Sequence, residues 1–163
     1  MGYWGRMLVA RSARPLSELS AVREVDVLDE KIFQDGWRCA QLDGDVRKAL
    51  PALVTGTGAP ALTAYILDSD AAVVEALTPG GVSWQAYLHE ATALEYQAPP
   101  LEHPVDEVVR RALAWSAEAG VTASGAALGA AFGAHNDTAE ETLDELLAAL
   151  GLVPVGVVQS AAD

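Results

Sequence analysis

Three strand-like runs between residues 61 and 89 constrain the fold of this chain more than any other part of its sequence. Turn-forming residues separate the runs at positions 68–70 and 78–81. In the second separator, Pro79 and Gly80 occupy the two central positions, which predicts a type II turn because glycine tolerates the positive φ required there. The apolar positions of the third run alternate and are Val82, Trp84, Ala86 and Leu88. The pattern predicts an antiparallel meander with one buried face.

Two further strands are expected before the meander. Residues 7–12 and 37–42 are apolar runs, and Asp35-Gly36 marks a turn that would join residues 25–33 and 37–42 into a hairpin. Residues 43–45 then supply the N-cap of a helix over residues 46–54, in which Pro51 predicts a kink. The glycines at 56 and 58 follow this helix and precede Pro60, so they indicate a helix end and not a phosphate-binding loop.

Helical patterns dominate after residue 104. Pro104 and Gly120 bracket the first predicted helix, which offers Trp115 for burial. A second helix is expected from Thr122 to Phe132. A third covers residues 138–150, with Asp137 and Glu140 as a capping box, and residues 152–158 are expected to form a last edge strand.

The order of these elements predicts the fold class. Strands come first and helices follow, which is typical of an α+β fold and not of alternating βαβ units. We therefore expect an antiparallel sheet, made of the N-terminal strands and the meander, packed against C-terminal helices. One domain over residues 1–163 is favoured, and the alternative is a division near residues 97–104 into a sheet-rich part, 1–96, and a helical part, 104–150.

Charge is distributed very unevenly along the chain. Residues 1–48 carry eight basic and eight acidic residues, whereas residues 49–163 carry two basic and fifteen acidic ones, so the whole net charge of −13 belongs to the second part. Such a surface repels phosphate backbones, which disfavours nucleic-acid binding, including by the helices of residues 112–163, where Lys and Arg are absent. The acidity serves either solubility or association with a basic protein partner.

Cysteine usage and hydropathy predict the compartment. Cys39 is the single cysteine, so no intramolecular disulfide can form, and it is expected in the core of its strand. No apolar run approaches the roughly 18 residues that a membrane helix needs, and the first residues do not resemble a signal peptide. A cytoplasmic location without membrane association is expected.

Four residues are the best polar candidates for a ligand or metal site. Asp68 and Asp70 are two residues apart, as in carboxylate pairs that bind a hard cation, although turns between strands favour the same residues. His89 and Glu90 are adjacent at a strand end and would suit acid–base work in a cleft. The histidines have no zinc-binding spacing, and neither a metal nor another cofactor is predicted. A non-enzymatic role is favoured.

The aromatic residues are divided between the core and the surface. Trp84 and Trp115 occupy predicted buried faces. Tyr3 and Trp4 precede the first strand, so they would either seal the sheet edge or contact a partner.

Two stretches resemble a group of known proteins. The opening MGYWGRMLVARS and the later AYILDSDAAVVEALTPGGVSWQAYLHE are similar to small acidic actinobacterial proteins that have no assigned activity. The resemblance covers the first 96 residues. It implies a bacterial source and no site residues.

Two functional hypotheses follow. The first is a bacterial protein-binding module without catalytic activity that neutralises or regulates a basic partner, in the manner of small acidic domains that cover basic toxins or nucleases. The alternative is a small-ligand-binding protein or enzyme with a cleft near Asp68, Asp70, His89 and Glu90. Screening by salt would weaken the first kind of binding, whereas the second requires converging polar groups.

Overall fold

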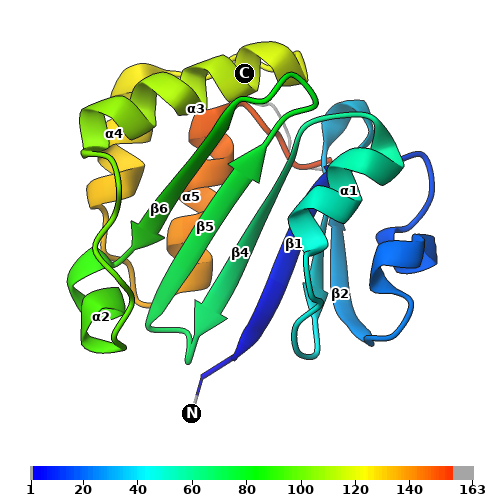
Figure 1. The fold of residues 1–163 in the computed structure, drawn as a ribbon, viewed down its shortest axis with the longest axis horizontal. Helices are drawn as coiled ribbons and strands as arrows, with labels where there is room; N and C mark the ends of the chain where they lie inside the picture. The colour runs from blue at the N-terminus through cyan, green and yellow to red at the C-terminus, as the bar shows by residue number, and fades with distance from the viewer. Residues whose placement is uncertain (1, 156–163) are drawn as a thin grey trace.

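The structure is a computed structural model, and it describes residues 2–155. Six strands form one antiparallel sheet in the order β2-β3-β1-β4-β5-β6 (Figure 1). The strands are β1 Gly5–Arg11, β2 Val27–Ile32, β3 Trp37–Leu42, β4 Ala61–Leu67, β5 Ala71–Leu77 and β6 Ser83–Leu88. The helices are α1 Ala49–Thr57, α2 Glu90–Glu95, α3 Val105–Ala119, α4 Gly125–Gly133 and α5 Ala139–Leu150. The predicted α+β class is confirmed.

The predicted meander is confirmed as β4, β5 and β6, but its second turn differs from the prediction. Gly81 has the positive φ, 95°, whereas Gly80 does not. The backbone N–H of Thr78 donates to the Val82 carbonyl at 2.9 Å, which leaves three residues in the loop. A three-residue hairpin loop places its left-handed residue last, so the type II prediction is wrong.

The N-terminal hairpin is also confirmed, and β1 lies between it and the meander. β3 pairs with β2 on one side and with β1 on the other, and β1 pairs with β4. The turn between β2 and β3 is a short 3₁₀ segment, Gln34–Gly36, in which Asp35 has a positive φ of 61°. The first strand of the chain therefore becomes a central strand of the sheet.

One face of the sheet packs against α3, α4 and α5, and α5 is seen behind β5 and β6 in Figure 1. The largest core cluster lies here and joins residues from Met7 to Leu152, on both sides of residues 97–104. Trp115 of α3 is completely buried, and its ring lies 5.7 Å from that of Trp37. Its Nε1–H donates to the carbonyls of Ala61 and Leu77 at 3.1 and 3.2 Å. Trp115 therefore ties α3 to the ends of β4 and β5.

The opposite face is covered in two separate places. α1 and the short 3₁₀ segments Leu16–Glu18 and Ser20–Val22 pack over β1 and β3 around Leu8, Ala40 and Leu53. α2 and the connector of residues 97–104 cover the far end of β5 and β6, where Tyr87 and Ala93 are buried. Between these two covers no helix lies over the middle of β5 and β6 (Figure 1), and Gln85 is exposed there.

Two predictions for the first helix, its N-cap and its kink, are corrected by the structure. α1 begins at Ala49 after Lys48, and Asp45 does not cap it because that carboxylate binds Arg6. Pro51 lies in the first turn of α1, where backbone N–H groups have no intrahelical acceptor, so no kink arises.

The predicted starts of the last two helices also shift. Ser124, not Thr122, caps α4, and its hydroxyl accepts from the backbone of Ala127. Thr138 and Glu141 form the capping box of α5, one residue after the predicted pair.

The segment after α5 returns to the sheet. Pro154 forms an antiparallel bridge with Phe33, and the Val155 backbone N–H donates to the Ile32 carbonyl at 2.9 Å. Residues 152–155 thus form a single bridge next to the end of β2 and not the strand that was predicted over residues 152–158, of which residues 156–158 lie outside the described part of the chain.

Candidate functional site

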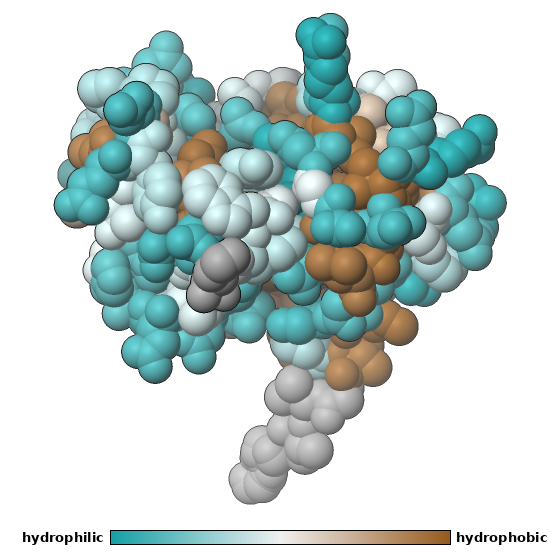
Figure 2. All heavy atoms as spheres, turned by 90° about the horizontal axis from the view of Figure 1, so that it is seen from below, coloured by the Kyte–Doolittle hydropathy of each residue, from teal (hydrophilic) through white to brown (hydrophobic). Residues whose placement is uncertain are grey.

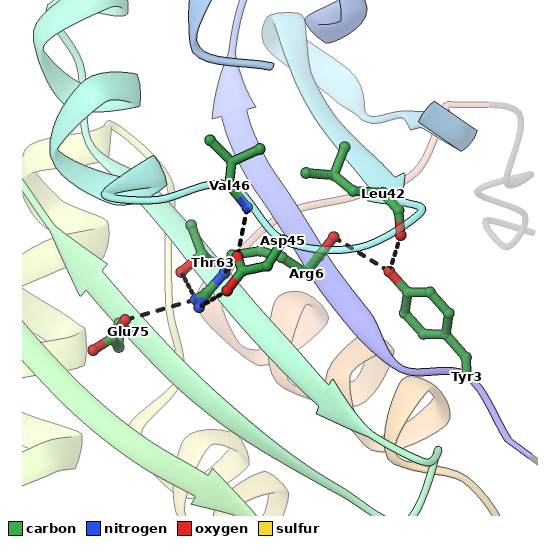
Figure 3. Close-up of polar contacts among 7 residues, drawn as sticks. All are labelled: Tyr3, Arg6, Leu42, Asp45, Val46, Thr63 and Glu75. Atoms are coloured by element: carbon green, nitrogen blue, oxygen red, sulfur yellow. Dashed lines mark hydrogen bonds and ion pairs between the residues drawn. The ribbon is translucent and has the colours of Figure 1, made fainter. Parts of the chain in front are cut away.

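Arg6 is the centre of a polar cluster on the open sheet face (Figure 3). Its Nε donates to Asp45 at 2.5 Å and its Nη2 donates to the other carboxylate oxygen at 3.1 Å. Nη1 donates to Thr63 at 3.1 Å and lies 3.7 Å from the Glu75 carboxylate. The guanidinium also lies over the ring of Tyr65. Arg6 therefore fastens the loop after β3 to strands β1, β4 and β5.

We expect Arg6→Gln to lower the free energy of unfolding by about 1 kcal/mol at pH 7 and by less at pH 3. Burial acts to raise the pKa of Asp45, but the hydrogen bond and charge of Arg6 outweigh it and hold the pKa below its ordinary value. A lowered pKa stabilises the fold above the ordinary Asp range, and this contribution is lost as pH falls through the folded-state value. Asp45 is half-exposed, which limits the effect.

Urea unfolding at several pH values measures this difference. The same comparison in an Asp45→Asn background is the control, because there the part of the pH dependence that comes from Asp45 should disappear and only the weaker contact with Glu75 remains. An Arg6→Gln effect that stays constant from pH 7 to pH 3 would contradict the assignment.

Asp68, Ser69 and Asp70 form the turn between β4 and β5, and their side chains have separate structural partners. Asp68 accepts from the backbone N–H of Gly2 at 2.7 Å. Ser69 accepts from the Tyr3 N–H and donates to Glu140, both at 2.8 Å. The turn therefore holds the first residues of the chain against the start of α5. Within residues 2–155, no group of three or more His, Cys, Asp or Glu side chains is arranged to bind a metal.

His89 belongs to a buried hydrogen-bond network. Its Nδ1 lies 2.7 Å from the Asp70 carbonyl and its Nε2 lies 2.8 Å from the Thr142 hydroxyl. A carbonyl only accepts, so Nδ1 carries a proton, and Thr142 can donate to Nε2 while accepting from Asn136 at 3.0 Å. The ring of His135 stacks on His89 at 3.9 Å. His89, directly after β6, thus joins the turn between β4 and β5 to α5.

Cys39 lies in the core, as predicted. It is buried, and burial raises the pKa of its thiol to about 12. The protonated thiol is a poor nucleophile.

The predicted partner contacts Tyr3 and Trp4 behave differently. The Tyr3 hydroxyl donates to the Leu42 carbonyl at 2.5 Å, and burial raises its pKa. Trp4 is 49% exposed, and its ring meets that of Tyr96 edge to face at 5.7 Å. Tyr3 therefore holds the sheet, whereas Trp4 is open to solvent.

Trp4 and Tyr96, together with the carboxylates of Asp68, Asp70 and Glu95, are here called the aromatic–carboxylate patch. The Tyr96 hydroxyl donates to Asp70 at 3.0 Å. That hydrogen bond, partial burial and the charges of Asp70, Asp68 and Glu95 raise the pKa of Tyr96. Figure 2 shows this end of the molecule from below, with apolar residues gathered on the β2 side and mostly hydrophilic residues on the α2 side.

A cavity of about 390 Å³ lies along β6, and we call it the β6 groove. Its walls come from β6, α2, the connector, the start of α3 and the end of α4, and its rim carries Glu90 and Glu102. The apolar walls include Tyr87, Leu94, Leu101, Val105 and Phe132. Of the four polar candidates named from the sequence, Glu90 lines this groove, whereas Asp68, Asp70 and His89 do not.

A second cavity of about 260 Å³ adjoins the groove at Glu102 and His103. It opens on the free sheet face beside Glu75 and Gln85, and Arg111 borders it. Arg111 binds Glu107 at 2.8 Å and the Ser83 carbonyl at 3.1 Å, so its charge is already compensated.

Sequence reasoning did not identify Tyr96, Arg6 or the groove. Tyr96 follows a short helix without a distinctive pattern, and Arg6 lies inside a strand, where a lone arginine carries no local signal.

The fold and its patch define an acidic α+β protein built on a six-stranded antiparallel sheet. Comparison of the chain with protein-family models, with curated proteins and with solved structures gives no match. In the described residues, every helix is too short or too polar to cross a membrane.

Proposed function

We propose that this chain is an acidic protein-binding module without catalytic activity, which neutralises or regulates a basic partner through the aromatic–carboxylate patch. The observation that carries the proposal is the exposed Trp4–Tyr96 pair with carboxylates on its border. Aromatic rings and carboxylates both attract Lys and Arg side chains, and exposed tryptophan and tyrosine are frequent anchors at protein interfaces.

The charges near the patch support a cationic partner. Asp68, Asp70 and Glu95 form no ion pair within residues 2–155. Residues 49–109 contain neither Lys nor Arg, and Arg110 and Arg111 are both paired with Glu107. Within residues 2–155, the three patch carboxylates are therefore free of direct ion pairs, and such carboxylates can accelerate association with a basic surface.

The hydrogen bonds of the polar candidates also favour binding over catalysis. His89 uses both ring nitrogens in buried contacts, and Asp68 accepts from the backbone. These side chains support the turn between β4 and β5, on which the patch is built.

A pair of matched triple variants tests the proposal. The patch variant carries Asp68→Asn, Asp70→Asn and Glu95→Gln, which removes three charges and keeps oxygen acceptors. The control variant carries Glu18→Gln, Glu24→Gln and Asp26→Asn, which removes three exposed charges elsewhere. Binding of a labelled Arg- and Lys-rich peptide is measured by fluorescence anisotropy at 50 and 200 mM salt.

We expect the patch variant to bind about tenfold more weakly than the wild type, because three rim charges at a few tenths of a kcal/mol each sum to about one decade. The binding free energy lost in the control variant should be less than about half of that lost in the patch variant. Equal losses in the two variants would show that only the overall charge matters and would overturn the proposal. Trp4→Ala should also weaken binding.

A further inference from the structure

The β6 groove is an apolar depression beside the patch, and α2 connects the two. Leu94 of α2 lines the groove and is 43% exposed, and Tyr96, just after α2, belongs to the patch. Val105, at the first position of α3, is 53% exposed on the other side. The volume of about 390 Å³ falls within the range of roughly 300–1,000 Å³ typical of ligand sites.

The edge of β6 offers free backbone groups next to this groove. Thr78 and Val82 form a hydrogen-bonded pair, so by alternation Gln85 and Tyr87 are in non-hydrogen-bonded pairs with β5. Their N–H and C=O groups point away from β5, and no hydrogen bond to them is formed within residues 2–155. Unpaired groups at a strand edge are the usual partners of an extended peptide.

The rim of the groove is acidic. Glu90 has no ion-pair partner in the described chain, and Glu102 approaches only His103, at 3.7 Å. Among residues 2–155, the groove lining contains neither Lys nor Arg. An occupant that places a cation beside its apolar group therefore complements both the walls and the rim.

We propose that the β6 groove binds an extended peptide segment of the basic partner, with one apolar side chain inserted between Leu94 and Val105 and flanking Lys or Arg side chains facing Glu90 and Glu102. This inference rests on the proposed function and adds a sequence requirement to it: the recognised segment is both basic and apolar. Backbone pairing to β6 selects an extended segment over a helix.

Two labelled peptides test the requirement, Arg-Lys-Leu-Lys-Arg and Arg-Lys-Gly-Lys-Arg, with the full chain as the binding protein. We expect the leucine peptide to bind about tenfold more tightly, as partial burial of a leucine side chain predicts. Val105→Gln and Leu94→Gln should each reduce this preference to within about twofold. Leu113→Gln, an exposed apolar position on α3 outside the groove, is the matched control and should keep it.

Each other outcome has a distinct meaning. Equal, salt-sensitive binding of the two peptides overturns the groove proposal and leaves the proposed function standing, whereas failure of both peptides to bind overturns both. Competition by leucinamide as strong as that of the leucine peptide would make the groove a small-amine site and overturn the peptide proposal. A wild-type dimer that Val105→Gln converts to a monomer would show that a second copy occupies the groove, which also overturns it.

Discussion

Trp115→Ala is expected to lower the free energy of unfolding by about 3–5 kcal/mol, since it removes a large, completely buried side chain from the core. The substitution also removes the Nε1–H that bonds to the carbonyls of Ala61 and Leu77. A small domain has a total stability of roughly 5–15 kcal/mol, so much of it would be lost.

Thermal and urea unfolding measure this loss, and two further variants separate its causes. Trp115→Phe keeps an aromatic ring but removes the donor, so it should cost less, about 1–3 kcal/mol. Trp4→Ala removes an exposed ring and should change stability by less than about 1 kcal/mol. Equal unfolding midpoints for the Trp115→Ala and Trp4→Ala variants would contradict the role of Trp115 as the link between α3 and the sheet.

Gly151→Ala is expected to cost about 3 kcal/mol or more, because two constraints act on this residue. Gly151 ends α5 with a φ of 105°. Residues that carry a Cβ rarely adopt this backbone conformation. A Cβ atom placed there would also lie 2.5 Å from the carbonyl oxygen of Thr122 and 2.8 Å from its nitrogen. The backbone of the segment between α3 and α4 would have to move.

Gly129→Ala is the matched control for this prediction, measured by urea unfolding. Gly129 lies inside α4, and a Cβ there meets nothing within 4 Å. Alanine in a helix interior is more favourable than glycine by about 1 kcal/mol, so this variant should be neutral or more stable than the wild type. If Gly151→Ala proves as harmless as Gly129→Ala, the end of α5 does not lie as close to the Thr122 backbone as described.

The two functional proposals also depend on the packing of the helices against the sheet. The patch combines the turn between β4 and β5 with the residue before β1 and the residue after α2. A variant that loosens the sheet therefore weakens binding indirectly, and this is why the binding tests use exposed positions and charge changes that preserve hydrogen bonds.

The meander was predictable because its signals are local. Alternating apolar positions and two turn sequences define β4, β5 and β6 without reference to the rest of the chain. The type of the second turn was not predictable, since Pro79 is followed by two glycines and the pairing of β5 with β6 decides that Gly81 takes the positive φ.

α2 is an element that sequence reasoning missed. It has six residues, too few for a helical period to be recognised or for a helix to be stable alone. Ala93 packs in the small cluster with Ala71 and Tyr87, and this tertiary packing stabilises it. The patch and the groove both depend on α2, so neither was visible before the fold was known.

By itself, the sequence determined the order of strands and helices, the ends of several helices and the location of the excess negative charge. These properties depend on neighbouring residues, through side-chain period, turn chemistry and capping. Tertiary structure alone decided that β1 is central, that Trp4 meets Tyr96 and that Arg6 binds Asp45 while Asp68, Asp70 and Glu95 form no ion pair. Such pairings join residues far apart in the chain, and they depend on strand register and packing, which no local pattern encodes.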